Sequence, residues 1–552
     1  MTQAQQFDLL LIFGVSNMEE TNYTSKSLDH LGLVAGFCQE VGIAAHIDTY
    51  FPQQSSQKHL TYGQCVEAML LNGLGFVGRT LHMYPQYFDS KPVERLLGAG
   101  ITAENINDDV LGRCLDKLYE VGVSDLYQML AEKVIVHLGL PCDSVHLDSS
   151  SFHVDGEYES EDDFQGVRLV RGYSRDHRPE LNQVILNLIT ENQAGLPVYM
   201  QACSGNSNDS ETFKQLVKSH IGSLKAAQRS RYFVGDASLY VAQTIQSLDQ
   251  QKQLFVTRVP QKLLEAKSHI QHAASYDFTP MENGYSGTWL SSDYGGVKQK
   301  WLLIRSEQAS YREQKTLEKQ ALKSSEASIR QFNKLCREEF SCKEDAMNQL
   351  QTWAAKQKYV DIANVHVTDS IKHAKRGRPS KESPGKTVYL ITGNIYICLD
   401  KYSQLAQEKG LFILATNDCS GKLDMETLLA HYKSQQSVER GFRFLKSPDF
   451  LTSSFYLKKP ERIEALLMVM TCCLMVYAAL EHLTRNKLRE HNQSIPNMKQ
   501  KPTQKPTARW IFYCFQGVEE LSVDGKQIII NLKASHRTIL DCLGACYRQI
   551  YS

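Results

Sequence analysis

The sequence predicts a mixed α/β fold with a separate helical segment near its start, and three observations support this prediction. Apolar runs typical of strands alternate with helical segments between about residue 143 and residue 260. The alternation resumes after about residue 396, beyond an interruption. From about residue 26 to residue 125, in contrast, apolar residues recur at helical spacing. Alternating strands and helices favour a sheet that is covered by helices.

The N-terminal helical segment contains two clear amphipathic stretches. The first extends from Tyr62 to Leu74. The second follows the run from Asn107 to Asp109. Its leucines recur at helical spacing, at Leu111, Leu115 and Leu118. Acidic and amide side chains accept hydrogen bonds from the unpaired N–H groups of a helix N-terminus. We therefore expect a helix at each place.

Five strands and two helices are expected between residues 143 and 260. The strands are Ser144–Phe152, Val184–Ile189, Leu196–Met200, Arg231–Asp236 and Gln253–Arg258, and the helices are Glu211–Gln228 and one that begins at Tyr240. This order of elements is typical of a mixed α/β domain. Asp148 and Asp236 are each expected at a strand end.

The interruption, from about residue 261 to residue 395, has short strand-like pieces around a long charged helical segment. The strand-like pieces are Trp301–Ile304 and Val388–Ile391, and the helical segment is Ser310–Lys358. A basic loop broken by glycine and proline, Lys375–Lys381, precedes the second piece. The α/β pattern then resumes with a strand at Leu411–Asn417, a helix at Met425–Lys446 and a further helix that begins at Pro460.

These patterns divide the chain into six segments. They are an N-terminal extension (1–25), a helical N-terminal domain (26–125), the first part of the α/β core (126–260), an insertion (261–395), the second part of the core (396–484) and a helical C-terminal region (485–552).

The composition excludes several classes of protein. The 61 basic and 61 acidic residues balance, which argues against a small, uniformly basic DNA-binding module, although a large enzyme can carry basic stripes on a neutral total. The 14 cysteines lack zinc-finger spacing. The first residues do not have the pattern of a secretion signal. The longest uncharged run, Ala465–Leu480, is shorter than the roughly 20 residues that span a bilayer, so we expect a core helix there and a cytoplasmic protein without membrane contact.

Three carboxylates, those of Asp148, Asp236 and Glu439, stand out by their context. The aspartates follow apolar strand residues, and Glu439 lies within the expected helix Met425–Lys446. In-line attack on a phosphodiester uses two divalent cations about 4 Å apart, and Mg²⁺ prefers oxygen ligands of this kind. The alternative is that the aspartates are turn or capping residues and that the glutamate is solvated. Context alone leaves both interpretations open.

Five motifs favour the first interpretation. They are LDSSSF at Leu147–Phe152, GYSRDHRPELNQ at Gly172–Gln183, a G-x-P to GNSND segment at Gly195–Asp209, VGDA at Val234–Ala237, and YKSQQSVERGFRFLK at Tyr432–Lys446. In this order and spread, the chain resembles the DDE transposases of bacterial insertion sequences. It is most similar to the insertion-sequence-four superfamily, and within it to the branch called sixteen thirty-four. Three N-terminal segments resemble the domain attached to this branch, namely Leu31–Ala35, Leu71–Gly75 and Asn107–Gly112.

The resemblance implies a ribonuclease-H-like catalytic core with a strand-rich insertion between the second aspartate and the glutamate. It implies that Asp148, Asp236 and Glu439 are the catalytic residues and metal ligands, with Mg²⁺ as cofactor and Mn²⁺ as a substitute. The implied partners are DNA, as terminal inverted repeats and as target, and a second copy of the chain on paired ends, in the bacterial cytoplasm at the nucleoid. The helical N-terminal domain is the expected end-binding domain.

The fifth motif departs from the family pattern Tyr-x₂-Arg-x₃-Glu-x₆-Lys at one position. The residues that match are Tyr432, Glu439 and Lys446. Gln435 stands where the family has arginine, and its uncharged amide weakens one expected phosphate contact. Arg440 and Arg443 lie on the same expected helix and could compensate. The alternative for these two arginines and for Lys446 is a solvated basic face.

Three further groups have two open interpretations each. Arg376 and Arg378 resemble arms that bind the minor groove of DNA, or they belong to a charged linker. His177 and Arg178 could approach DNA, although a turn is the favoured interpretation. The tryptophans of the insertion could stack on an unpaired base, although packing is favoured; they are Trp289 and Trp301.

The sequence thus predicts a cut-and-paste DNA transposase that uses a two-metal mechanism. Two alternatives stay open. One is a decayed or domesticated transposon-derived DNA-binding protein, against which the presence of all three carboxylates argues. The other is a ribonuclease-H-like nuclease that cuts without joining.

Overall fold

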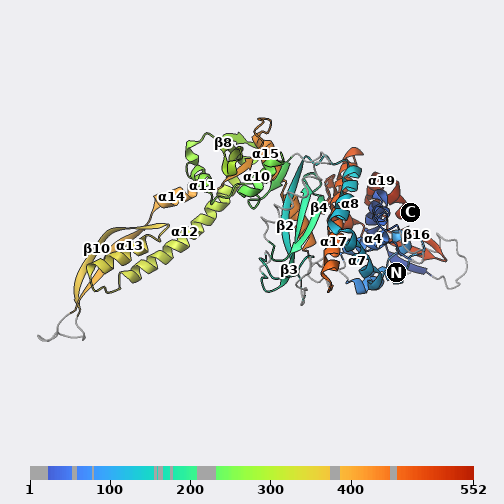
Figure 1. Ribbon diagram of the computed structural model, residues 1–552, viewed down its shortest axis with the longest axis horizontal. Coiled ribbons are helices and arrows are strands. Elements are labelled where there is room, and N and C mark those ends of the chain that lie inside the picture. The colour runs from blue at the N-terminus through green and yellow to red at the C-terminus, as the bar shows by residue number, and fades with distance from the viewer. Residues whose placement is uncertain are drawn as a thin grey trace. The chain divides into compact units, whose positions relative to one another are not determined.

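The computed structural model describes residues 23–52, 59–76, 80–154, 158, 166–174, 178–207, 232–372, 386–447 and 457–552, apart from the side chains of 436–439. The chain forms two compact units (Figure 1). Unit 1 comprises Met1–Phe255 and His431–Ser552, and unit 2 comprises Val256–Ala430. The boundaries of the six segments inferred from the sequence stay a prediction.

Helices form most of the described N-terminal part of unit 1. After a short strand, β1 (Tyr23–Ser27), come α2 (Leu31–Val41), α3 (Ile43–Asp48), α4 (Tyr62–Leu74), α5 (Tyr84–Asp89), α6 (Val93–Leu97), α7 (Asp108–Val121) and α8 (Val123–Leu138). Both predicted helices are confirmed. Thr61 and Gln64 form a capping box at the start of α4, and the Asn107 side chain accepts a hydrogen bond from Val110 N at the start of α7.

The sheet of unit 1 contains β2 (Ser144–Val154), β3 (Asn182–Glu191), β4 (Pro197–Ser204) and β5 (Tyr232–Gly235), in the order β4-β3-β2-β5. Strand β2 pairs antiparallel with β3 and parallel with β5, and β3 pairs antiparallel with β4. These strands were predicted from their apolar runs. The helix expected at Glu211–Gln228 lies outside the described residues, and α10 (Ala242–Gln250) follows the sheet as expected.

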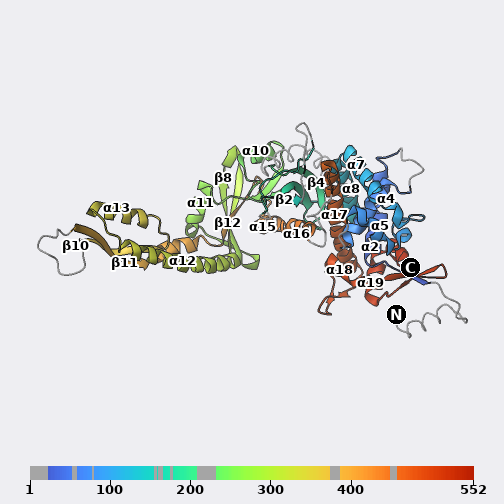
Figure 2. The same ribbon diagram turned by 90° about the horizontal axis from the view of Figure 1, so that it is seen from below.

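Helix α17 (Pro460–Glu490) is the central helix of unit 1 (Figure 2). It contacts α2, α4, α7 and α8, strand β4 and the short helix α16 (Gln436–Leu445). Its length and composition would allow it to cross a membrane, but 78% of its most apolar window is buried inside the protein. Ala465–Leu480 is therefore part of a core helix, as predicted, and Pro460 occupies its first turn.

The C-terminal part of unit 1 contains α18 (Ala508–Cys514), β15 (Glu519–Val523), β16 (Lys526–Ile530), α19 (Ala534–Leu543) and α20 (Ala545–Ile550), after the short strands β13 (Ile495–Pro496) and β14 (Pro502–Thr503). The prediction of a helical region missed these strands. Strand β15 pairs with β16 and also with β1, so the two ends of the described chain share one small sheet. Local sequence cannot show such a pairing because its partners are about 500 residues apart.

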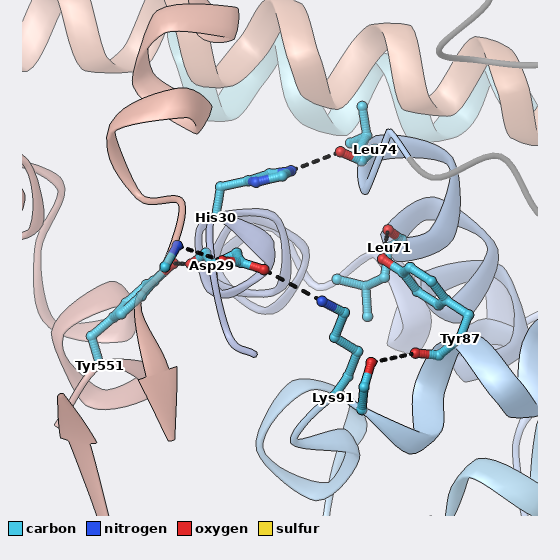
Figure 3. A network of polar contacts seen from close by, with 9 residues as sticks. Asp29, His30, Leu71, Leu74, Tyr87, Lys91 and Tyr551 are labelled. Atoms are coloured by element: carbon cyan, nitrogen blue, oxygen red, sulfur yellow. Dashed lines mark hydrogen bonds and ion pairs between the residues drawn. The ribbon is translucent and has the colours of Figure 1, made fainter. Parts of the chain in front are cut away.

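Figure 3 shows how the chain enters α2. Asp29 adopts a left-handed conformation (φ 48°) between β1 and α2. Its carboxylate accepts hydrogen bonds from Lys91 Nζ (3.4 Å) and Gly517 N (2.8 Å), and its carbonyl accepts one from the Tyr551 hydroxyl (2.5 Å). His30 donates from Nε2 to the Leu74 carbonyl (2.8 Å). N-terminal and C-terminal segments therefore form one body.

Unit 2 contains strands in the order β12-β9-β8-β7, together with a long hairpin. The strands are β12 (Leu411–Thr416), β9 (Gln299–Ser306), β8 (Tyr285–Ser292) and β7 (Thr279–Met281), and β6 (Leu254–Arg258) pairs with β12. The hairpin consists of β10 (Val360–Lys372) and β11 (Lys386–Ile397), and α14 (Leu399–Gln407) follows it. The basic loop Lys375–Lys381 lies outside the described residues.

One helical segment and one long helix that were predicted from the sequence each consist of two helices. The helical segment Ser310–Lys358 contains α12 (Glu307–Leu335) and α13 (Lys343–Ala354). They pack on the hairpin around a cluster that includes Phe332 and Ile391 (Figure 1). Met425–Lys446 is likewise divided into α15 (Met425–Lys433) and α16. The Ser434 hydroxyl donates to the carbonyl of His431 (2.7 Å) at this break, and such local bonds compete with helical ones.

Candidate active site

Two aspartates lie at equivalent distances along the adjacent parallel strands of unit 1, Asp148 within β2 and Asp236 directly after β5. The register pairs His146 of β2 with Val234 of β5. Asp148 and Asp236 each lie two residues beyond this pair. Adjacent strands are roughly 4.8 Å apart, so the two backbone positions are neighbours. The parallel pairing thus brings two aspartates that are 88 residues apart in sequence to neighbouring positions at one end of β5.

The surroundings of the two aspartates differ. Asp236 directly follows β5, as predicted, and is exposed. Its Oδ1 accepts hydrogen bonds from the backbone N–H (2.9 Å) and the hydroxyl of Ser238. Asp148 is half-buried, and its Oδ1 accepts from Ser149 N (2.8 Å). The prediction of a strand end was wrong for Asp148, because β2 continues to Val154 through its pairing with β3.

One face of β2 lies against the segment that contains α16. Side chains alternate between the faces of a strand, so the even-numbered residues of β2 share a face. Ser144 Oγ is hydrogen-bonded to His431 Nδ1 (3.1 Å), and His146 Nε2 to Ser434 Oγ (2.9 Å). Farther along this face, Lys446 Nζ lies 5.5 Å from the centre of the Phe152 ring. Asp148 belongs to the same face, between the second and third contacts.

The contacts of His146 with Ser434 and of Phe152 with Lys446 enclose Asp148 on the strand and position 439 on the helix. From His146 to Phe152, β2 rises by about 20 Å at 3.3 Å per residue. Helix α16 spans Gln436–Leu445, between the residues of these two contacts, and it contacts β2. An unbroken helix from Ser434 to Lys446 would rise by about 18 Å, which is similar to the length of the strand segment.

Positions 439 and 446 are seven residues apart, which corresponds to nearly two helical turns. Lys446 is the C-cap residue that follows α16. Lys446 contacts β2 at Phe152. The Glu439 side chain itself lies outside the description. Among the described side chains, no group of three potential metal ligands is present.

Helix α16 is held from its other side by α17. Gly441 faces Leu474, because a Cβ atom at this glycine would lie 3.0 Å from Leu474 Cδ2. Phe442 and Leu445 are buried, and Phe444 stacks on Tyr477 of α17 with ring centres 4.4 Å apart. Sheet and core helix therefore fix α16 between them.

His146 is a buried residue beside Asp148 on the same strand face. A hydroxyl has one hydrogen, and that of Ser434 is donated to the carbonyl of His431, so His146 Nε2 is the donor to Ser434 Oγ. Burial, assisted by the nearby His431, lowers the pKa of His146 to about 4. The imidazole is therefore neutral at physiological pH. The His431 ring also packs on Tyr232 of β5, with centres 4.9 Å apart.

The predicted DNA-binding residues near α16 fall into two groups. Arg440 and Arg443 are exposed, whereas Tyr432, Gln435 and Lys446 are half-buried. Lys446 is therefore not part of a fully solvated face, since its ammonium lies over Phe152. The DNA-binding role of all five stays a prediction.

Other candidates lie elsewhere. Arg376, Arg378 and His177 lie outside the described residues. Arg178 is exposed and pairs with Glu180. Trp301 is fully buried in β9, which favours packing over base stacking, and Lys300 lies over the ring of Trp289.

The glycines of two sequence motifs meet around Gln183, which is buried. Gln183 Nε2 donates to the carbonyls of Gly205 (2.7 Å) and Tyr173 (3.1 Å). A Cβ atom at Gly172 would lie 2.0 Å from Gly205 O, and one at Gly205 would lie 2.1 Å from Gln183 O. These motif residues therefore shape the sheet end near Val154.

Sequence reasoning missed the residues that join β2 to α16. These are Ser144, His146, His431 and Ser434. The alternation of β2 was a usable signal, because it places two polar residues on the face of Asp148. Their partners could not be identified, since the helix break at Ser434 was not predicted.

The chemistry of the donors suits a hard divalent cation. Asp148 and Asp236 supply only oxygen donors, as Mg²⁺ and Mn²⁺ prefer, and the helix that carries Glu439 lies on the same face. Two-metal sites, in which such oxygen donors hold the cations, catalyse the cleavage and transfer of phosphodiesters in nucleases and polymerases.

Comparison with known families assigns the chain. The family described as "Transposase DDE domain" matches residues 145–476, which is more than half of the chain. The chain therefore belongs to this family, and it is a DNA transposase of the DDE class. Residues 23–132 match a second family, described as "Domain of unknown function (DUF4277)". The first match includes both aspartates and Glu439.

The other comparisons give little more. No curated protein is significantly similar to the chain. Among solved structures, a similar one is described as "Cryo-EM structure of piggyBac transposase synaptic complex with hairpin DNA", with 11% identity over 90% of this chain and 83% of that one. Its TM-score is 0.37. This similarity is low, and the assignment rests on the family match.

Proposed function

We propose that the protein is the cut-and-paste transposase of a bacterial insertion sequence, and that Asp148, Asp236 and Glu439 are its catalytic carboxylates. The observation that carries this proposal is the equivalent position of the two aspartates on adjacent parallel strands, with α16 alongside. The parallel pair β2–β5, flanked by antiparallel β3 and β4, is compatible with a ribonuclease-H-like core. The motifs favour the sixteen thirty-four branch of the insertion-sequence-four superfamily.

The proposed chemistry assigns a task to each carboxylate. Mg²⁺ ions, for which Mn²⁺ would substitute, would activate the attacking oxygen and stabilise the leaving one. Asp148 and Asp236 would hold the cations between the two strands, and Glu439 would complete the ligand set from α16. Water would attack first, and the freed 3′-hydroxyl would attack next, on the opposite strand or on target DNA.

Basic residues beside the carboxylates would hold the phosphate backbone. Arg440 and Arg443 are exposed on α16, within two turns of Glu439. Gln435 occupies the place of the family arginine and carries no charge, so we assign its phosphate contact to these two residues. Tyr432 and Lys446 complete this part of the surface. Arg376 and Arg378 are proposed as a second DNA contact, on the minor groove.

The partners follow from the same proposal. The helical N-terminal domain would recognise the terminal inverted repeats, and two copies of the chain would assemble on paired ends. The target would be bacterial DNA in the cytoplasm, without membrane contact. The burial of α17 supports the proposal that the protein acts without membrane contact, because the longest apolar helix among the described residues is a core element.

One assay tests the proposal and separates its rivals. DNA flanking the gene supplies candidate inverted repeats, which are labelled and incubated with the full chain and Mg²⁺. We expect strand cleavage at the repeat ends, and transfer of pre-cut ends to a target plasmid. Binding without cleavage would instead identify a decayed or domesticated protein. Cleavage without transfer would identify a nuclease that does not join.

A further inference from the structure

We infer that His146 and Ser434 are positioning residues, whose hydrogen bond sets the height of helix α16 on strand β2 and thereby brings Glu439 level with Asp148. This inference rests on the proposed function, because it concerns the geometry of that metal site. It adds two residues that neither the sequence motifs nor the family match assigns to the site.

The bond lies close in sequence to both Asp148 and Glu439. The contact between His146 Nε2 and Ser434 Oγ (2.9 Å) joins the residue two before Asp148 to the residue five before Glu439. Sliding α16 by one helical turn would displace it by about 5.4 Å. Such a shift would break this bond and would remove the third carboxylate from the level of the aspartates.

The bond between His146 and Ser434 is fixed at both ends. Ser434 lies at the break between α15 and α16, and its hydroxyl is already committed to the carbonyl of His431 (2.7 Å). In its bond with His146, the Ser434 oxygen is therefore the acceptor and His146 Nε2 is the donor. His146 is fully buried within a strand that is paired on both sides, so its ring has little freedom.

His431 connects the same helix junction to both β2 and β5. Its Nδ1 is hydrogen-bonded to Ser144 of β2 (3.1 Å), and its ring packs against Tyr232 of β5. On its other side, α16 contacts α17 through Gly441, which faces Leu474, and through Phe444, which stacks on Tyr477. The hydrogen bonds of His146 and His431 add directional contacts to this packing, because hydrogen bonds depend on the angle between donor and acceptor. Partners that orient metal ligands typically change metal affinity by about 10–100-fold.

The test measures metal binding and cleavage on matched variants of the full chain. Ser434→Ala and His146→Asn remove the bond from opposite ends, because an asparagine amide cannot reach the place of Nε2. Ser434→Thr keeps the hydroxyl, and His146→Gln carries an amide N–H near the place of Nε2. Tyr87→Phe is the control, since it removes another buried hydrogen bond of unit 1, to the Leu71 carbonyl (3.1 Å), away from α16.

Binding of Mn²⁺ alone is followed by electron paramagnetic resonance of the free ion, and the Mg²⁺ concentration for half-maximal cleavage is measured on end DNA. We expect Ser434→Ala and His146→Asn to weaken both by roughly tenfold, and their double variant to weaken them no further. Ser434→Thr, His146→Gln and Tyr87→Phe should remain within about twofold of the unmodified chain. Circular dichroism and the thermal midpoint identify variants that fail to fold, and the remaining variant of each pair then decides.

Two results would overturn the inference. One is unchanged Mn²⁺ binding in folded Ser434→Ala and His146→Asn. The other is an equal loss in Tyr87→Phe, which would indicate general destabilisation. Asp236→Ala distinguishes failure of the proposed function, because normal cleavage by that variant would refute the metal site itself. Loss of cleavage in Asp236→Ala, together with unchanged Mn²⁺ binding and unchanged cleavage in Ser434→Ala, would refute the positioning role alone.

Discussion

The Tyr551 hydroxyl donates a hydrogen bond to the backbone carbonyl of Asp29, and so joins the last described helix to the start of the helical N-terminal part (Figure 3). The Tyr551 ring is buried against Gly32 of α2, where a Cβ atom would lie 2.6 Å from the ring. Nearby, Arg95 pairs with Glu520 and donates to the carbonyls of Ile550 and Ser552 (both 3.0 Å). The C-terminal residues therefore belong to the core of unit 1.

This relationship predicts a large loss of stability in Tyr551→Ala. The change leaves a cavity beside Gly32 and an unsatisfied carbonyl at Asp29, and large-to-small changes of buried aromatics cost about 3–5 kcal/mol. Urea unfolding of the full chain measures the effect. Tyr513→Ala is the control, because the Tyr513 side chain is 64% exposed, and its change should cost less than about 1 kcal/mol. Equal losses in the two variants would contradict the role of Tyr551.

A second prediction concerns the motif glycine Gly205. Its replacement by alanine places a methyl group 2.1 Å from the Gln183 carbonyl, which is backbone and cannot move aside without distorting β3. We expect a lower thermal midpoint, corresponding to a cost of at least about 2 kcal/mol. Gly393→Ala is the matched control in a strand of unit 2, where the nearest atom would be 3.3 Å away. A smaller effect of Gly205→Ala than of Gly393→Ala would refute the close approach.

A third prediction is a pH dependence that Glu67 imposes on folding. Burial raises the pKa of this carboxyl from 4.5 to about 7, although Ala44 N donates a hydrogen bond to it (3.2 Å). Because the folded pKa lies above the unfolded one, the stability contributed by the protonated carboxyl is full below pH 4.5. It is lost as the pH rises through 7.

Glu67→Gln keeps the shape and removes this charge. The free energy of unfolding of Glu67→Gln, relative to that of the unmodified chain, should rise from pH 5 to pH 8. The rise should be at most roughly 3 kcal/mol. Denaturant unfolding at both pH values measures the gain, and Glu132→Gln, an exposed change on α8, should show none. A gain that is the same at pH 5 and pH 8 would show that Glu67 does not titrate as described.

A fourth prediction concerns the stacking of Phe444 on Tyr477. Tyr477 also contacts Phe512, and Phe512 stacks on His30 (ring centres 4.4 Å apart), so aromatic rings connect α16 to the start of α2. Tyr477→Leu should lower cleavage more than end binding, because it loosens the support of α16. Band-shift and cleavage assays on one end DNA measure both. Weaker end binding with undiminished cleavage of the bound fraction would contradict this expectation.

Much of the fold could be predicted from local patterns. The apolar runs of β2 to β5 and the capped helices α4 and α7 were identified because their residues form the signals themselves. The small sheet of β1, β15 and β16 could not, because its pairing depends on tertiary contact. The break at Ser434 was hidden within a helical pattern, and a side-chain hydrogen bond from Ser434 to the His431 carbonyl accompanies it.

The candidate site was predicted in part. Motif positions identified Asp148, Asp236 and Glu439, and strand alternation could have indicated the face of β2 on which Asp148 lies. The registers decide the rest: only the parallel pairing of His146 with Val234 shows that the aspartates are level. Pairing of residues about 90 positions apart leaves no trace in a single sequence.

The most direct test of the central claim is single-turnover cleavage of end DNA by the Asp236→Ala chain in Mg²⁺, compared with the unmodified chain. Asp148→Ala and Glu439→Ala complete the set, and band-shift assays report end binding. We predict that each substitution lowers the cleavage rate by at least about 1,000-fold, or about 4 kcal/mol, while end binding stays within about twofold. Normal excision by Asp236→Ala would contradict the assignment of the site.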